Sequence, residues 1–211
     1  MTIKDRQERE REEMRELILN AANKIMSEEG IDKLSVRKIA NRIEYSPTII
    51  YHYFRDKDEI VEHQMKRGYQ KILTALSSVN SVEGSPVERL RAQTRKYIEA
   101  ALKMPDEYKA AQLSTSPAIL EYTSSLFKGA ASKKPALRIL TQCLKEIYKD
   151  KNVDDSFIEL TAQVLAASTF GLIIKLILEK DIGEDQRNQL IDHYVHSMID
   201  GMILGKSLEN V

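Results

Sequence analysis

The chain has 211 residues, 42% of them apolar, which is enough to bury a hydrophobic core in one or two domains. Its 32 basic and 32 acidic side chains cancel, so no net charge draws it toward nucleic acid or membranes. A single cysteine, Cys143, excludes an internal disulfide, and the charged opening MTIKDRQERERE lacks the apolar core of a signal peptide. We therefore expect a cytoplasmic protein, in which any affinity for DNA must come from a local basic patch.

Apolar residues recur at helical spacing along the chain, and the alternating pattern of strands is missing, so an all-α fold of about nine helices is expected. In the first helix the apolar residues share one face: Met14, Leu17, Ile18, Ala21, Ala22, Ile25 and Met26. Gly30 ends this helix, as a glycine after the last turn commonly does.

Two short helices and a long one follow. Ser35 is a good N-cap for the second helix, and Ser46 followed by Pro47 supplies the cap and the first-turn proline of the third. Asp56, with Glu59 three residues later, resembles a capping box at the start of the fourth helix. Because a tight turn joins the second and third helices, the segment has the arrangement of a helix-turn-helix.

This helix-turn-helix, at residues 35–54, is expected to expose a face suited to DNA. Burial is predicted for Ile39, Ile43, Tyr45, Ile50 and Phe54. The outward face of the third helix then carries side chains that can touch base edges and thymine methyls: Pro47, Thr48, Ile49, Tyr51 and His52. Residues 33–57 hold six basic and two acidic side chains, a local charge of plus four that favours phosphate binding. The alternative is that this amphipathic unit is only a folding module.

The serine-rich stretch at residues 77–85 is the expected boundary between two domains. We assign residues 1–76 to the DNA-binding domain and residues 77–211 to a second helical domain. The two longest helices of the second domain are expected at about residues 155–179 and 184–206. Residues 162–178 form the longest apolar stretch, but polar side chains interrupt it, so a buried helix is expected rather than a membrane span.

Residues 12–72 contain a distinctive series of side chains in order: Ile18, Ala21, Ala22, Gly30, Leu34, Ser35, Val36, Arg37, Ile39, Ala40, Ser46, Thr48, Ile49, Ile50, Tyr51, Tyr53, Phe54, Asp56, Lys57 and Asp58. The series resembles the amino-terminal domain of the tetracycline-repressor (TetR) family. The resemblance implies a two-fold symmetric repressor that binds double-stranded DNA, with carboxy-terminal helices that bind a small molecule and thereby alter DNA affinity.

The resemblance also implies a role for each matching side chain. Ser35 and Arg37, at the start of the second helix, and Lys57, at the start of the fourth, would contact phosphates. The groove and the DNA backbone would be met by Ser46, Pro47, Thr48, Ile49, Tyr51, His52 and Tyr53. Glu44 departs from the family, which usually has glycine in this turn, and a non-glycine residue with positive φ is uncommon. Either the turn is built differently or some strain is tolerated.

A small-molecule effector is expected to bind between helices, mainly in the second domain. The side chains that could line such a cavity and orient a ligand are Tyr69, Gln93, Tyr97, Gln112, Tyr122, Phe127 and Phe170. Core packing is the alternative for each aromatic residue among them, because apolar residues at helical spacing are first of all core.

The last two helices are the expected homodimer interface. Small residues that allow close helix packing occur in both: Ala162, Ala166, Ala167 and Gly171 in one, Gly201 and Gly205 in the other. The final helix also carries an apolar band wider than one helix face needs, which indicates burial on two sides. A four-helix bundle formed by two helices from each subunit satisfies this pattern, and the resemblance implies the same interface.

No catalytic constellation emerges from the sequence, so we expect neither an enzyme nor a cofactor. His193 and His196 lie on one side of the last helix with Asp200, as a metal pair requires, but no fourth ligand can be named and no metal is expected. His63 and Cys143 lack a recognisable catalytic partner.

Two hypotheses follow. The first is a ligand-responsive transcriptional regulator, a repressor that binds a palindromic operator as a homodimer. The second is a helical small-molecule-binding or scaffold protein that keeps a vestigial helix-turn-helix. DNA binding discriminates between them.

Overall fold

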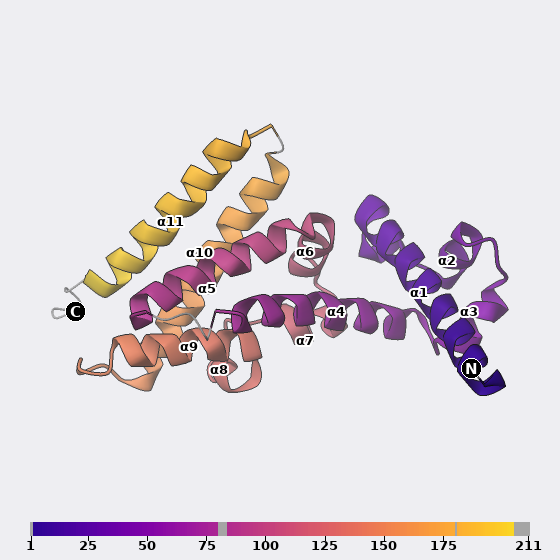
Figure 1. Cartoon of the computed structure of the whole chain (residues 1–211), viewed down its shortest axis with the longest axis horizontal. Coiled ribbons are helices and arrows are strands. Elements are labelled where there is room, and N and C mark those ends of the chain that lie inside the picture. Colours follow the sequence, from indigo (N-terminus) through magenta and orange to yellow (C-terminus); the bar gives the residue numbers. More distant parts are fainter. Residues whose placement is uncertain (1, 80–83, 180, 205–211) are drawn as a thin grey trace. The chain divides into compact units, whose positions relative to one another are not determined.

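The computed structural model describes residues 2–79, 84–179 and 181–204, and over these residues it contains eleven α-helices and one short 3-10 helix (Figure 1). No strand occurs in this part of the chain, which confirms the all-α expectation. The helices outnumber the expected nine in part because α8 (Ala130–Lys133) has four residues and no cap or proline of its own. The predicted end of the last helix near residue 206, and Gly205 with it, lie outside the described residues.

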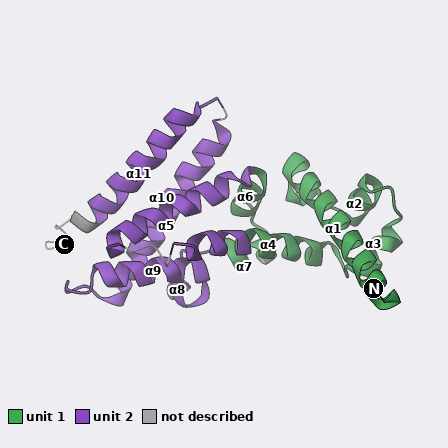
Figure 2. Ribbon diagram, in the orientation of Figure 1, with its two compact units in different colours: residues 1–69, 106–123 green, residues 70–105, 124–211 purple. Residues whose placement is uncertain are grey.

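The chain forms two compact units (Figure 2). Unit 1 comprises Met1–Tyr69 and Asp106–Thr123, and unit 2 comprises Gln70–Pro105 and Ser124–Val211. These units are not the two continuous segments 1–76 and 77–211, and the domain boundary near residue 76 stays a prediction. Residues 106–123 belong to unit 1 because Ile119 is fully buried in the core of that unit, and because Glu107 accepts a hydrogen bond from Asn23 at 2.8 Å.

Unit 1 contains the amino-terminal helices. Their bounds are α1 (Ile3–Glu29), η1 (Ile31–Lys33), α2 (Val36–Arg42), α3 (Pro47–Tyr53), α4 (Lys57–Ser77, up to Tyr69), α6 (Pro105–Gln112, from Asp106) and α7 (Pro117–Thr123). α1 packs against α2, and α2 against α3. Their shared core includes Ile18, Ile25, Ile39 and Ile50, none of which retains more than 1% exposure, together with Phe54. This core fixes the orientation of the short α3.

α1 begins well before the predicted apolar face. Thr2 caps it by accepting a hydrogen bond from the Asp5 backbone N–H at 3.2 Å, and the Asp5 side chain accepts one from Thr2 in return. Gly30 ends the helix, as predicted, with a φ of 90°. Most of the predicted apolar face is buried, but Leu17 is 41% exposed.

Unit 2 contains the remaining helices: α5 (Pro86–Leu102), α8, α9 (Pro135–Ile147), α10 (Asp155–Leu178) and α11 (Glu184–Leu204). α5 and α9 both pack against α10, and α11 packs against α5 and α10 (Figure 1). The Tyr194 hydroxyl links α11 to α10 through Ser168 and Thr169, at 2.7 and 2.9 Å. The two longest helices thus form a hydrogen-bonded pair.

α10 is apolar on all sides. By length and composition alone it could cross a membrane, with 39% of its most apolar window buried. One side holds core residues such as Leu165 and Ile173, which favours the predicted core helix over a membrane span. The other side exposes a row of apolar or small residues, called here the α10 stripe: Leu160, Val164, Ala167, Gly171 and Leu178; the exposed Lys175, paired with Glu179, lies in the same line. Their spacing of three, four or seven residues places them along one line of the helix.

Candidate nucleic-acid interface

The turn between α2 and α3 is a Schellman motif, in which a left-handed residue ends the helix. The Tyr45 N–H donates to the Ala40 carbonyl at 3.0 Å, and the Glu44 N–H donates to the Asn41 carbonyl at 3.3 Å. Glu44 occupies the left-handed position with a φ of 61°, a conformation that glycine adopts at less cost. The turn therefore keeps the geometry that a glycine would give and tolerates the strain of a side chain.

α3 is buried on one face and exposed on the other. Ile50 is fully buried, whereas Tyr51 is 57% exposed. The exposed residues at its start and along its outer face are those predicted to meet DNA: Ser46, Pro47, Thr48, Tyr51 and His52. Ile49 and Tyr53 are half-buried. The fold thus presents a continuous polar and aromatic surface on this helix.

The predicted burial of Tyr45 was wrong, and that of Ile43 was only partly right. Tyr45 is 44% exposed and Ile43 is half-buried. Both flank the left-handed Glu44, where the chain turns away from the axis of α2, so the helical spacing that predicted their burial no longer applies. Tyr45 thereby becomes part of the exposed surface before α3.

Two helix starts flank α3 and carry the residues predicted to contact phosphate. Ser35 caps α2 by accepting a hydrogen bond from the Lys38 N–H at 3.2 Å, and its hydroxyl hydrogen remains able to donate. Asp56 caps α4 by accepting from the Glu59 N–H at 2.9 Å. This bond, and that from Arg55, lower the pKa of the Asp56 carboxyl. Lys57, the first residue of α4, is exposed, as is Arg37 in α2.

Acidic side chains, two of them outside residues 33–57, neutralise part of the expected basic patch. Three of the six basic side chains are in ion pairs: Lys38 with Glu29, Arg42 with Glu28 at 2.6 Å, and Arg55 with Asp56 at 2.9 Å. Glu28 and Glu29 end α1, so a count confined to residues 33–57 misses them. For Lys33, Arg37 and Lys57 no ion pair occurs within the described residues, and all three are exposed. They are the cations left available for phosphate.

One interaction at the carboxyl end of α3 was not predicted from the sequence. Arg15 of α1 donates through Nη1 to the Tyr53 carbonyl at 2.7 Å, and its guanidinium carbon lies 4.3 Å from the centre of the Phe54 ring. Its position directly after Met14, at the edge of the apolar face, was the only signal. Nothing in the sequence indicated which helix it would contact.

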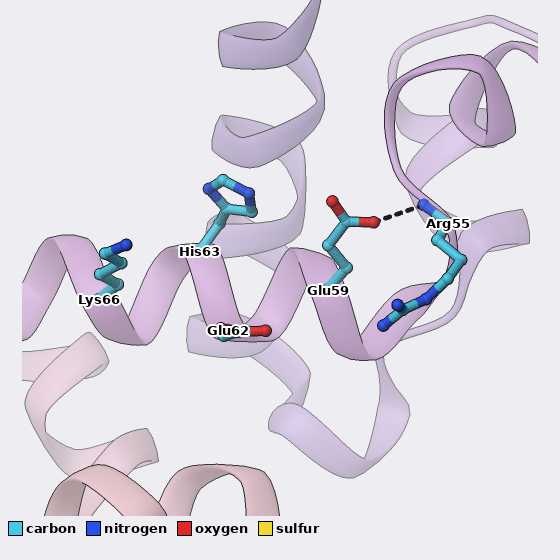
Figure 3. Close-up of a pocket in the computed structure, with 5 residues that line it drawn as sticks. All are labelled: Arg55, Glu59, Glu62, His63 and Lys66. Carbon is cyan, nitrogen blue, oxygen red and sulfur yellow. Dashed lines mark hydrogen bonds between the residues drawn. The ribbon is translucent and has the colours of Figure 1, made fainter.

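A pocket of about 270 Å³ in unit 1 is charged rather than apolar (Figure 3). It is lined by Arg55, Glu59, Glu62, His63 and Lys66, four of which lie along α4. Effector cavities are mostly apolar with a few polar anchors, and none of the residues predicted to bind a ligand lines this pocket. It therefore gives no support to an effector site.

The seven predicted ligand-binding side chains divide between the two units. Tyr69 and Tyr122 meet edge to face in unit 1, with ring centres 6.2 Å apart, and Gln112 lies in α6 of the same unit. The other four belong to unit 2: Gln93, Tyr97, Phe127 and Phe170. Gln93 is buried, and the ammonium groups of Lys133 and Lys134 lie 5.8 and 5.9 Å from the centre of the Phe127 ring. An effector site that uses these residues stays a prediction.

The side chains considered for metal or nucleophile chemistry have other contacts. Asp200 pairs with Arg91, and His196 Nδ1 lies 2.8 Å from the Asp192 carbonyl oxygen. Within residues 2–79, 84–179 and 181–204, no group of three or more possible metal ligands is present. The buried Cys143 thiol donates to the Pro86 carbonyl at 3.1 Å, and burial raises its pKa to about 11. Such a thiol is a poor nucleophile at neutral pH.

Comparisons with known proteins agree with this geometry. Residues 18–63 match the family model described as bacterial regulatory proteins, tetR family. An uncharacterised HTH-type transcriptional regulator, YuxN from Bacillus subtilis, is 24% identical over 90% of this chain and 64% of its own length. HbdR, an HTH-type transcriptional regulator from Aromatoleum, is 36% identical over 37% of this chain and 34% of its own length.

A solved structure shares the fold. The TetR family transcriptional regulator PfmR from Thermus thermophilus superposes with a TM-score of 0.63 at 18% identity, over 86% of this chain and 96% of that one. At this identity the likeness shows the fold, and the chain spans less than two thirds of the length of the curated relatives it matches. The tetR family model thus matches the helix-turn-helix segment that carries the sequence resemblance. Members of that family are DNA-binding regulators rather than enzymes, which agrees with the expectation of a non-enzymatic protein.

Proposed function

We propose that the chain binds a palindromic operator as a homodimer and represses transcription until a small molecule binds, and that it acts in the cytoplasm. The observation that carries the DNA-binding part is the exposed outer face of α3, whose inner face is buried in the core of unit 1. The exposed cations Arg37 and Lys57 precede and follow this helix in the sequence. Its outer face can reach base edges, while the two cations and Ser35 can contact phosphates on either side.

The same proposal assigns base and backbone contacts within α3. The residues expected in the major groove are Ser46, Pro47, Thr48 and Ile49, and those expected at base edges or sugar-phosphate are Tyr51, His52 and Tyr53. Few of them are charged, so discrimination among bases would rest on packing, including apolar contact with thymine methyls.

Dimerisation is proposed through α10 and α11. The α10 stripe supports this, because five apolar or small residues lie exposed in one line, and the charged Lys175 in that line is already paired with Glu179. Leu190 of α11 is likewise exposed. A second copy related by a two-fold axis would cover both surfaces and would present two copies of α3 to successive half-sites of the operator.

A small molecule bound by the carboxy-terminal helices is proposed to change DNA affinity through α4. This helix begins at Lys57 and contributes residues to both units. Half-sites lie about 34 to 36 Å apart, so a shift of a few ångströms in the separation of two recognition helices misplaces one of them. An effector would act by favouring one separation over the other.

Selection of bound duplexes from a random DNA pool tests the proposal. Tyr51→Ala should weaken binding to the selected duplex by about tenfold or more, because it removes a large exposed ring from the recognition surface. Lys57→Ala should weaken binding across all sequences and lower the slope of log affinity against log salt by about one.

A matched control is available on the same helix. Lys66→Ala makes the same charge change on α4 but lies away from its start, so its salt slope should equal that of the unaltered protein. If the unaltered protein selects no duplex even in low salt, the regulator proposal fails and the small-molecule-binding or scaffold alternative is favoured.

A further inference from the structure

The Arg15 side chain connects three helices of unit 1. Its Nη1 donates to the Tyr53 carbonyl at 2.7 Å, its Nη2 lies 3.2 Å from His63 Nε2, and its guanidinium lies over the Phe54 ring at 4.3 Å. Phe54 in turn meets His63 edge to face, with ring centres 5.6 Å apart. One half-buried side chain of α1 thus touches the end of α3 and the middle of α4.

The contact with Tyr53 closes the carboxyl end of the recognition helix. Tyr53 is the last residue of α3, and the final carbonyls of a helix have no partner within it. A cationic donor there both satisfies the carbonyl and interacts favourably with the negative end of the helix dipole. Because α3 has only seven residues, this bond is a substantial part of what fixes its far end.

The chemistry of the cluster also fixes the direction of the second bond. A guanidinium can only donate, so in a hydrogen bond between Arg15 Nη2 and His63 Nε2 the histidine nitrogen is the acceptor. Arg15 is therefore held from both α3 and α4 while its plane rests on a ring that is 1% exposed. Two of its five N–H donors are thereby engaged within unit 1.

We infer that Arg15 is a positioning residue for DNA recognition. It fixes the orientation of α3 by binding the carboxyl end of that helix to α1 and α4, and it does not itself contact DNA. This inference rests on the proposed placement of α3 in the major groove. The Schellman turn fixes the amino end of α3, and Arg15 performs the corresponding task at the other end.

The test compares variants in binding to the selected duplex over a series of salt concentrations, at a temperature where circular dichroism shows each to be folded. Arg15→Met keeps the unbranched stem and removes every donor, and it should weaken binding about tenfold without changing the salt slope. Arg15→Lys keeps a cationic donor on a longer stem, able to approach the Tyr53 carbonyl, and should recover part of that loss. The control Arg11→Met makes the same charge change one turn earlier, at an exposed site, and should stay within about twofold of the unaltered protein.

Three results would overturn the inference. A salt slope lowered by about one in Arg15→Met would show a direct phosphate contact instead. Unchanged affinity in folded Arg15→Met would show that the contact serves stability alone. A failure of the unaltered protein to bind any duplex would refute the proposed function and this inference with it.

Discussion

The two surfaces proposed to meet partners, the outer face of α3 and the α10 stripe, are exposed for opposite reasons. α3 is held outward by contacts within unit 1, namely a Schellman turn at one end and the contact from Arg15 of α1 at the other, and its exposed face is polar or aromatic. The α10 stripe is exposed because the helix is apolar on all sides and one copy of the chain covers only part of it. The outer face of α3 is therefore formed within one chain, whereas the α10 stripe is proposed to be covered by a second copy.

The largest expected effect concerns the α10 stripe. Leu160→Arg places a charge in the proposed dimer interface, where an unpaired buried charge costs about 3 to 5 kcal/mol. The dissociation constant of the dimer should therefore rise at least about a hundredfold. Sedimentation velocity over a concentration series measures this directly.

A matched leucine provides the control for this prediction. Leu113 and Leu160 are both 58% exposed, but Leu113 lies outside the α10 stripe. Leu113→Arg should therefore leave the dimer intact. Equal dissociation of both variants, or of neither, would contradict the assignment of the α10 stripe as the interface.

A smaller effect separates the available cations near α3 from the paired ones. Arg37→Ala should lower the salt slope of DNA binding by about one and weaken binding uniformly across sequences. Arg42→Ala should change the slope less, because Arg42 is already held by Glu28 at 2.6 Å. Fluorescence anisotropy with a labelled duplex gives both slopes, and equal slopes for the two variants would show that the ion pair opens on DNA.

The sequence predicted the helix-turn-helix well because its determinants are local. Caps at Ser35 and Asp56, the proline at the start of α3 and the turn at Glu44 all act within a few residues. The neutralising role of Glu28 and Glu29 was missed because it depends on how α1 lies against α2. The amino-terminal extension of α1 was missed for another reason, since the Thr2 capping box is a local signal that the search for apolar spacing overlooked.

Predictions about the carboxy-terminal region depended on contacts far apart in sequence. The two longest helices were expected close to where they occur, but the membership of α6 and α7 in unit 1 follows from the burial of Ile119, which spacing alone does not reveal. The predicted effector residues divide between two units for the same reason. Helical periodicity identifies which face is apolar but not what covers it.

Strain at the turn gives a further, more modest prediction. Glu44→Gly should raise the free energy of unfolding by about 1 kcal/mol, because glycine adopts the left-handed conformation without a Cβ clash. Glu44→Ala keeps the Cβ and should give no such gain. Urea unfolding followed by circular dichroism measures both, and equal stability of the two variants would mean that the side chain, rather than the backbone, sets the cost.

A pH-dependent effect lies in the interior of unit 2. Burial raises the pKa of Cys143 from 9.0 to about 11, so the folded state keeps its thiol proton at a pH where the unfolded chain has lost it. The free energy of unfolding should be unaffected below pH 9 and should fall as pH rises from 9 toward 11. Cys143→Ala lacks this group and should show a shallower decline in urea unfolding over the same range. Parallel declines would contradict the raised pKa.

Two copies of α3 are proposed to read the major groove of one operator. Methylation interference with dimethyl sulfate on the selected duplex tests this placement, because guanine N7 lies in the major groove and adenine N3 in the minor groove. Two groups of interfering guanines are expected, related by a two-fold axis and centred about 34 to 36 Å apart or a multiple of that distance. Interference confined to adenine N3, or a single unpaired group of guanines, would contradict it.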